Sequence, residues 1–135
     1  MDVGFILSKL DRCRISEVLR PKSDASSGVT RSKLSEKIRH ATLVEPSQIP
    51  PYVVTMNSRI LLASSLWGGP RECDLVYPQD ANCLEGGISI MSMMGINLLG
   101  CREGCAIQFS QGGRILHLQL LSLTYQPEAA RDWHR

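Results

Sequence analysis

The chain has few aromatic side chains, no long apolar run and almost no net charge, and each shortage excludes a class of protein. Seven aromatic residues among 135 are too few for the stacking platforms that bind single-stranded nucleic acid. No apolar run approaches the roughly 20 residues of a membrane-spanning helix. Fifteen Lys and Arg against 13 Asp and Glu leave a charge of +2, which argues against a protein that wraps nucleic acid.

The five cysteines also lack the C-x-x-C spacing of metal and redox motifs, and the chain begins without the basic flank of an export signal. We therefore expect reduced thiols and a cytoplasmic protein. Cys101 and Cys105 are a redox pair, two metal ligands or two small buried side chains, and the scattered histidines favour the last interpretation. We expect no metal and no cofactor.

The charge is unevenly distributed along the chain. Residues 1–47 carry +3 and residues 48–135 carry −1, with Pro46 and Pro50 at the junction. We therefore divide the chain into an N-terminal segment, 1–47, and a C-terminal segment, 48–135.

The N-terminal segment predicts two helices in an antiparallel hairpin. Ser8 is the expected cap of the first helix, which Pro21 ends, and Thr30 or Ser32 is the expected cap of the second. Each helix of about 12 residues is roughly 18 Å long. That is too little surface for independent stability, so we expect the hairpin to pack on the C-terminal segment.

The C-terminal segment is rich in strand signals. Gly-containing turns separate short apolar stretches, one short helix is expected over 95–100, and 79–87 is expected to be a polar loop. In the last strand the apolar residues change parity between Leu120 and Leu121, which predicts a β-bulge. The predicted strands cover 52–57, 59–63, 73–77, 88–91, 105–110 and the stretch around 116–125.

Catalytic motifs are missing. The glycine pairs lack the Lys-Ser/Thr of a phosphate loop, and His117 is expected on the strand face opposite the leucines, as a surface residue. The most unusual local feature is the run Met91, Ser92, Met93 and Met94. It is either core packing at a strand-to-helix junction or an adaptable contact surface for a protein partner.

Four blocks of the C-terminal segment resemble the bacterial regulator of nucleoside diphosphate kinase family. They are 53–59 (VVTMNSR), 75–78 (LVYP), 95–100 (GINLLG) followed by Gly104, and 123–130 (LTYQPEAA). The blocks follow one another in the family's order. The N-terminal segment matches more loosely, through Leu10-Asp11 and Arg14-Ile15.

The resemblance implies an α+β fold, with a short N-terminal helical hairpin, or coiled-coil arm, followed by an FKBP-like curved antiparallel sheet around a short helix. This is the domain type found at the C-terminus of the Gre transcript-cleavage factors. The resemblance also implies a monomer that binds RNA polymerase near its secondary channel, in competition with Gre factors, without chemistry of its own. No sequence-specific nucleic acid and no membrane are expected as partners.

Two segments carry the implied contacts. By position, the docking segment of Gre factors corresponds to Met91, Ser92, Met93 and Met94, although Met93 replaces a typical Pro and Cys105 a typical Asp. The hairpin tip, with Lys22, Ser23 and Asp24, holds one acid where Gre factors cluster carboxylates around Mg²⁺. Transcript cleavage by that mechanism should therefore be absent.

Two other functions stay open. Fold analogy allows a peptidyl-prolyl isomerase, although such an enzyme needs an aromatic-lined pocket. A thiol redox sensor would use Cys101 and Cys105.

Overall fold

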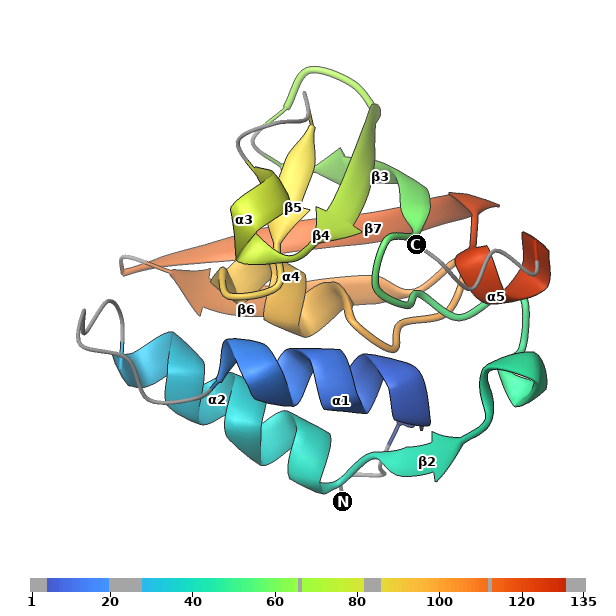
Figure 1. Cartoon of the computed structure of the whole chain (residues 1–135). Coiled ribbons are helices and arrows are strands. Elements are labelled where there is room, and N and C mark those ends of the chain that lie inside the picture. The colour runs from blue at the N-terminus through green and yellow to red at the C-terminus, as the bar shows by residue number, and fades with distance from the viewer. Residues whose placement is uncertain (1–4, 20–27, 66, 82–85, 112, 131–135) are drawn as a thin grey trace.

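The structure is a computed structural model that describes residues 5–19, 28–65, 67–81, 86–111 and 113–130. Helices and strands alternate irregularly, with a small sheet near the N-terminus and a larger one after it (Figure 1). The elements in chain order are β1 Ile6–Ser8, α1 Lys9–Val18, α2 Gly28–Arg39, β2 Thr42–Val44, the 3₁₀ helix Pro46–Gln48, β3 Arg59–Ser64, β4 Arg71–Val76, α3 Pro78–Ala81, β5 Gly87–Ser89, α4 Met93–Leu98, β6 Ala106–Gln111, β7 Arg114–Tyr125 and α5 Pro127–Ala130.

The start of helix α1 is the one that the sequence predicts. The hydroxyl of Ser8 accepts a hydrogen bond from the amide of Asp11 at 3.0 Å, which satisfies one of the free amides of the first turn. Helix α2 differs from its prediction, because it includes Gly28, and both Thr30 and Ser32 lie inside it. Ser and Thr are tolerated within helices, so their presence alone does not mark the first residue.

A two-stranded parallel sheet, which the sequence analysis missed, joins the outer ends of the two helices. Strand β1 pairs with β2, and Leu7 lies opposite Leu43. Each strand has three residues, too few to show an alternating pattern. Because β1 leads into α1 and β2 follows α2, the two helices run in opposite directions side by side (Figure 1).

The larger sheet has five curled strands in the order β5-β4-β3-β7-β6. A mixed α and β fold with a curled sheet is therefore confirmed. The expectation of a purely antiparallel sheet is wrong, because β4 and β5 pair in parallel. Helix α3 lies in the connection that allows this pairing, in a stretch predicted to be loop throughout.

The predicted strand over 52–57 is an irregular segment, which is buried from Val53 to Met56. Only Val53 forms a bridge, to Arg102, and the chain then turns at Asn57, whose φ of 66° lies in the left-handed region. The Ser58 amide donates to the Thr55 carbonyl, which closes the turn. The apolar residues of this segment correctly predicted that it is buried. The turn, however, prevents it from pairing continuously as a strand.

The bulge predicted in the last strand is confirmed. Leu61 of β3 pairs with Ser122 and Leu62 pairs with Leu120, so Leu121 has no partner in the ladder. Leu121 is 39% exposed, whereas Leu120 is fully buried. The extra residue reverses the strand's faces and bends it, as bulges do.

The helices and the sheet share one hydrophobic core, so the expectation that the N-terminal segment packs on the C-terminal one is confirmed. Four residues of the N-terminal segment belong to the same buried cluster as the sheet residues: Leu7, Ile15, and Leu34 and Ile38 of α2. None of the described helices has the length and apolar character needed to cross a membrane.

Candidate functional site

The methionine segment forms a capped turn between β5 and α4. The Ser92 hydroxyl accepts a hydrogen bond from the Gly95 amide at 3.0 Å and donates one to the Ser89 carbonyl at 2.7 Å. Met91, Met93 and Met94 are each partly buried against the core. The segment is therefore both core and surface, since each side chain contacts the interior and keeps an exposed part.

Helix α4 sits so close to the end of β5 that only glycine fits at the contact. A Cβ added at Gly95 would lie 2.1 Å from the carbonyl oxygen of Ser89, a backbone atom that cannot move aside. This contact fixes the methionine turn relative to the sheet. The three methionines are therefore presented from a rigid base, although each side chain is itself flexible.

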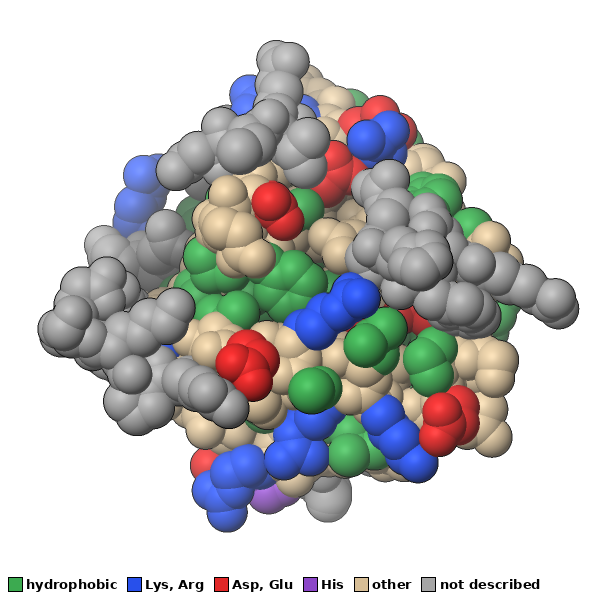
Figure 2. Space-filling model, in the orientation of Figure 1, with side chains coloured by type: hydrophobic (Ala, Val, Ile, Leu, Met, Phe, Trp, Pro, Cys, Tyr) green, Lys and Arg blue, Asp and Glu red, His purple; other side chains and the backbone are tan. Residues whose placement is uncertain are grey.

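Hydrophobic side chains gather on the face of the molecule that this turn occupies. Figure 2 shows them between α3 and α1, where Figure 1 places the connection from β5 into α4. Lys and Arg side chains lie below them, over the two long helices. An apolar patch bordered by charge is typical of a surface that binds another protein.

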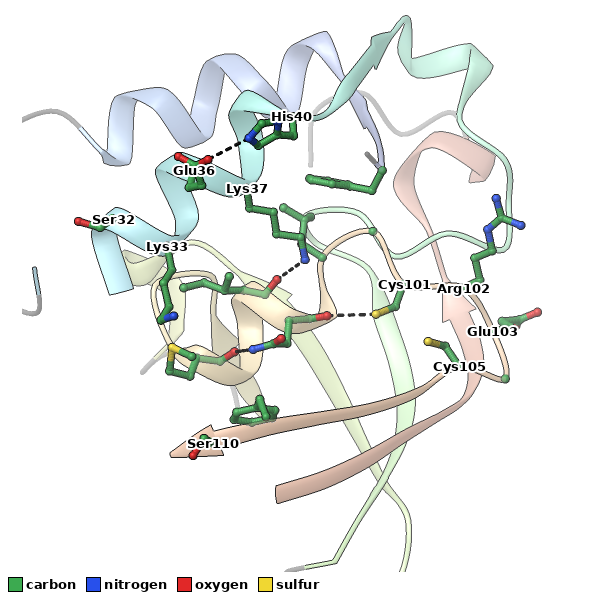
Figure 3. A pocket seen from close by; sticks show the side chains of 18 residues that line it. Ser32, Lys33, Glu36, Lys37, His40, Cys101, Arg102, Glu103, Cys105 and Ser110 are labelled. Carbon is green, nitrogen blue, oxygen red and sulfur yellow. Dashed lines mark hydrogen bonds and ion pairs between the residues drawn. The ribbon is translucent and has the colours of Figure 1, made fainter. Parts of the chain in front are cut away.

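A groove separates α2 from α4 and from the turn that follows α4 (Figure 3). Met93 lies in one wall, and Lys33 and Lys37 lie in the other. Lys37 crosses the groove, because its Nζ atom donates to the carbonyl of Ile96 and lies 5.0 Å from the centroid of the Phe5 ring. The methionine turn and the basic side of α2 therefore border the same groove.

A buried carboxyl pair, which the sequence analysis did not select, joins the two ends of the chain. Asp11 of α1 is 3% exposed and Glu128 of α5 is 8% exposed. Burial, and secondarily repulsion from Glu128, raise the pKa of Asp11 to about 7, and burial also raises the pKa of Glu128. The sequence held a signal that Asp11 is buried, because Asp11 stands four residues from both Leu7 and Ile15 and therefore shares the apolar face of the first helix.

The chain closely matches a curated bacterial protein over nearly its whole length. It is 36% identical over 130 residues to the regulator of nucleoside diphosphate kinase of Escherichia coli K12, which covers 96% of this chain and 95% of the relative. The Shigella flexneri protein of the same name gives the same values. The chain belongs to the regulator of nucleoside diphosphate kinase family.

The chain is also similar to the Gre factors. The family model described as "Transcription elongation factor, GreA/GreB, C-term" matches residues 49–125. The solved structure of the prokaryotic transcription elongation factor GreA/GreB from Nitrosomonas europaea is 31% identical and covers 92% of this chain and 100% of its own, with a TM-score of 0.74. The fold is therefore GreA/GreB-like.

Cys101 and Cys105 border the same groove. Cys101 Sγ donates to the Asn97 carbonyl at 3.1 Å, and Cys105 lies beside it (Figure 3). Burial, with a smaller effect from Cys105, raises the pKa of Cys101 to about 12. Since the thiolate is the reactive form, the structure favours a partly buried, unreactive thiol at Cys101. In the described part of the chain, no three His, Cys, Asp or Glu side chains gather as a metal site would require.

The predicted contacts divide between described and undescribed residues. Met91, Ser92, Met93 and Met94 come together in the capped turn. Lys22, Ser23 and Asp24 of the predicted hairpin tip lie outside the described residues. His117 is exposed on β7, as expected of a surface histidine.

Proposed function

We propose that this regulator binds RNA polymerase near its secondary channel, competes there with Gre factors and does not cleave the transcript. The observation that carries the proposal is the rigid, half-exposed methionine turn, Met91 to Met94, at the position that docks Gre factors. Family membership supports the same class of function. A monomer acting in the cytoplasm, where the polymerase works, completes the proposal.

The two segments take different parts in this proposal. Residues 48–135 form an FKBP-like docking domain that carries the methionine turn. Residues 1–47 form a short coiled-coil arm whose tip enters the channel. The arm offers one tip acid, Asp24, in place of a carboxylate cluster, so it occupies the channel without supplying a catalytic Mg²⁺.

The docking proposal is tested by binding to purified core polymerase. Full-length protein should be retained by immobilised core enzyme and displaced by a Gre factor. Met93→Glu should weaken binding at least tenfold, because a partner that covers this turn would bury an unpaired carboxylate. Leu121→Glu is the matched control, since it places the same charge at an exposed apolar position on β7, outside the methionine turn.

The outcomes separate the parts of the proposal. No retention at micromolar protein refutes polymerase binding altogether. If neither Met93→Glu nor Leu121→Glu changes retention, the interface lies outside the methionine turn. Stalled elongation complexes with Mg²⁺ test whether the protein cleaves the transcript. We expect it to produce no more shortened transcripts than the complexes produce without it.

A further inference from the structure

The buried carboxyl pair lies where four separate parts of the chain meet. Asp11 comes from α1, Glu128 from α5, Tyr77 from the end of β4, and Thr55 and Met56 from the irregular segment before β3. Helix α1 belongs to the N-terminal segment and the other parts to the C-terminal one. The pair therefore lies at the junction between the two segments.

Each carboxyl is held by one of two adjacent residues. The Met56 amide donates to Asp11 Oδ2 at 3.2 Å, and the Thr55 hydroxyl donates to Glu128 Oε1 at 2.7 Å. Ser58 completes the set, because its hydroxyl lies 3.0 Å from both the amide and the hydroxyl of Thr55. A shift of α1 away from the sheet would break the Asp11 bond first.

The groups facing Asp11 do not fully compensate its charge. Among the described residues, Arg14 on the same helix is the cation that favours ionisation of Asp11 and lowers its pKa, whereas burial and Glu128 raise that pKa by more. The buried Tyr77 hydroxyl also faces Asp11 and lowers its pKa, but this is the smallest of the effects on Asp11 and does not offset burial. Two buried carboxyls with one cation and one hydroxyl beside them make a poor site for two full negative charges.

We propose that Asp11 and Glu128 form a proton-dependent latch, which holds α1 against the 55–58 turn and α5 while Asp11 is protonated and loosens α1 when both carboxyls are ionised. The neutral Asp11 avoids repulsion from Glu128 and keeps the bond from Met56, because its carbonyl oxygen still accepts. Ionisation favours an opened form in which water reaches Asp11. The latch concerns the attachment of the arm and stands apart from polymerase binding.

The direction of the pH dependence of opening follows from the pKa of Asp11 in the closed and opened forms. The opened form releases the Asp11 proton near the ordinary pKa of 3.8, whereas the closed form keeps it to about 7. The opening constant therefore rises as the pH increases between these values and levels off above them. Between pH 6 and pH 8 it should rise about tenfold.

Amide hydrogen exchange of the full chain, corrected for the intrinsic pH dependence of exchange, tests the latch. The opening reaction that exposes the Ile15 amide in α1 to exchange should have a lower free energy, and a weaker dependence on urea, than the one that exposes the Leu118 amide in β7. Its opening constant should rise about tenfold from pH 6 to pH 8 in the wild type. It should stay constant in Asp11→Asn, which keeps an acceptor for Met56, and still rise in the control Asp80→Asn, whose side chain is exposed.

Three results overturn the latch. One is an Ile15 opening constant that does not change with pH, another is a rise that persists in Asp11→Asn, and the third is opening of Ile15 only with global unfolding. Carboxyl ¹³C titration of the wild type covers the case in which a variant fails to fold. It should give an Asp11 pKa near 7 that Glu128→Gln lowers, and a wild-type value below 5 would refute the latch.

Discussion

Lys37 of α2 donates a hydrogen bond from Nζ to the carbonyl oxygen of Ile96 in α4. This bond connects the N-terminal segment directly to the helix that follows the methionine turn. The same ammonium group lies over the ring of Phe5, so the lysine also secures the start of the described chain. One side chain thus sets the spacing of the groove between α2 and α4.

Replacing Lys37 with Met should lower the free energy of unfolding by about 1–2 kcal/mol, because a charge-assisted bond in a half-buried site is lost. Methionine keeps a similar length and apolar surface, so packing changes little. Urea unfolding measures the effect. Lys33→Met is the control on the same wall of the groove, and it should change stability by less than about 0.5 kcal/mol since Lys33 is exposed. Equal effects from both variants would contradict a specific bond at Lys37.

Gly95→Ala should destabilise the protein by about 2 kcal/mol or more, because the added methyl group would overlap the Ser89 carbonyl. The methionine turn would be displaced with α4. Thermal unfolding gives the stability change, and polymerase binding should weaken in parallel. Gly68→Ala is the control, since nothing lies within 4 Å of its added Cβ. Wild-type stability of Gly95→Ala would show that α4 can move away from β5 at little cost.

Asp11 should make the protein less stable as the pH rises. Its pKa is about 7 when folded and near 3.8 when unfolded, so the folded state binds more protons between these values. Its contribution therefore declines from about pH 4 to pH 7, by at most about 1.4 kcal/mol per pH unit. The difference in unfolding free energy between Asp11→Asn and the wild type, measured from pH 5 to pH 8, should grow in favour of the variant. A constant difference would place the folded pKa of Asp11 in its ordinary range.

The thiols should differ in reactivity. Because the pKa of Cys101 is raised to about 12, alkylation of Cys101 by iodoacetamide at pH 7.5 should be at least tenfold slower than that of the exposed Cys13. Mass spectrometry of the folded protein measures both rates. Denatured protein, in which all the cysteines react alike, is the control. Rapid labelling of Cys101, or a Cys101–Cys105 disulfide under mild oxidant, would support the redox alternative.

Local signals predicted the elements that depend on nearest neighbours. Ser8 caps α1 because its hydroxyl serves an amide three residues away, and the parity change at Leu120 and Leu121 is a bulge because the sheet has one buried face. Both effects act within a few residues. They are therefore readable without knowing the rest of the fold.

The features that the sequence did not predict depend on partners far away in the chain. Strand β2 exists because β1 lies beside it, and β5 is parallel to β4 because of the intervening connection. The carboxyl of Asp11 is perturbed by Glu128, at the other end of the sequence. Within the candidate site, the sequence left the methionine segment open between core packing and a contact surface, and the groove beside it depends on the position of α2.

The unpaired Leu121 has a consequence beyond the curvature of its strand. Downstream of it, Gln126 donates to the carbonyls of Pro50 and Val53 at 2.8 and 2.7 Å, and Glu128 receives its bond from Thr55. Removing one residue at the bulge would turn the next residues of β7 to the opposite face of the sheet and would shift the start of α5. The bulge at Leu121 and the second register shift, between Arg59 and Ile60 of β3, together set where β7 ends and where α5 begins. Helix α5 in turn carries the carboxyl that acts on Asp11.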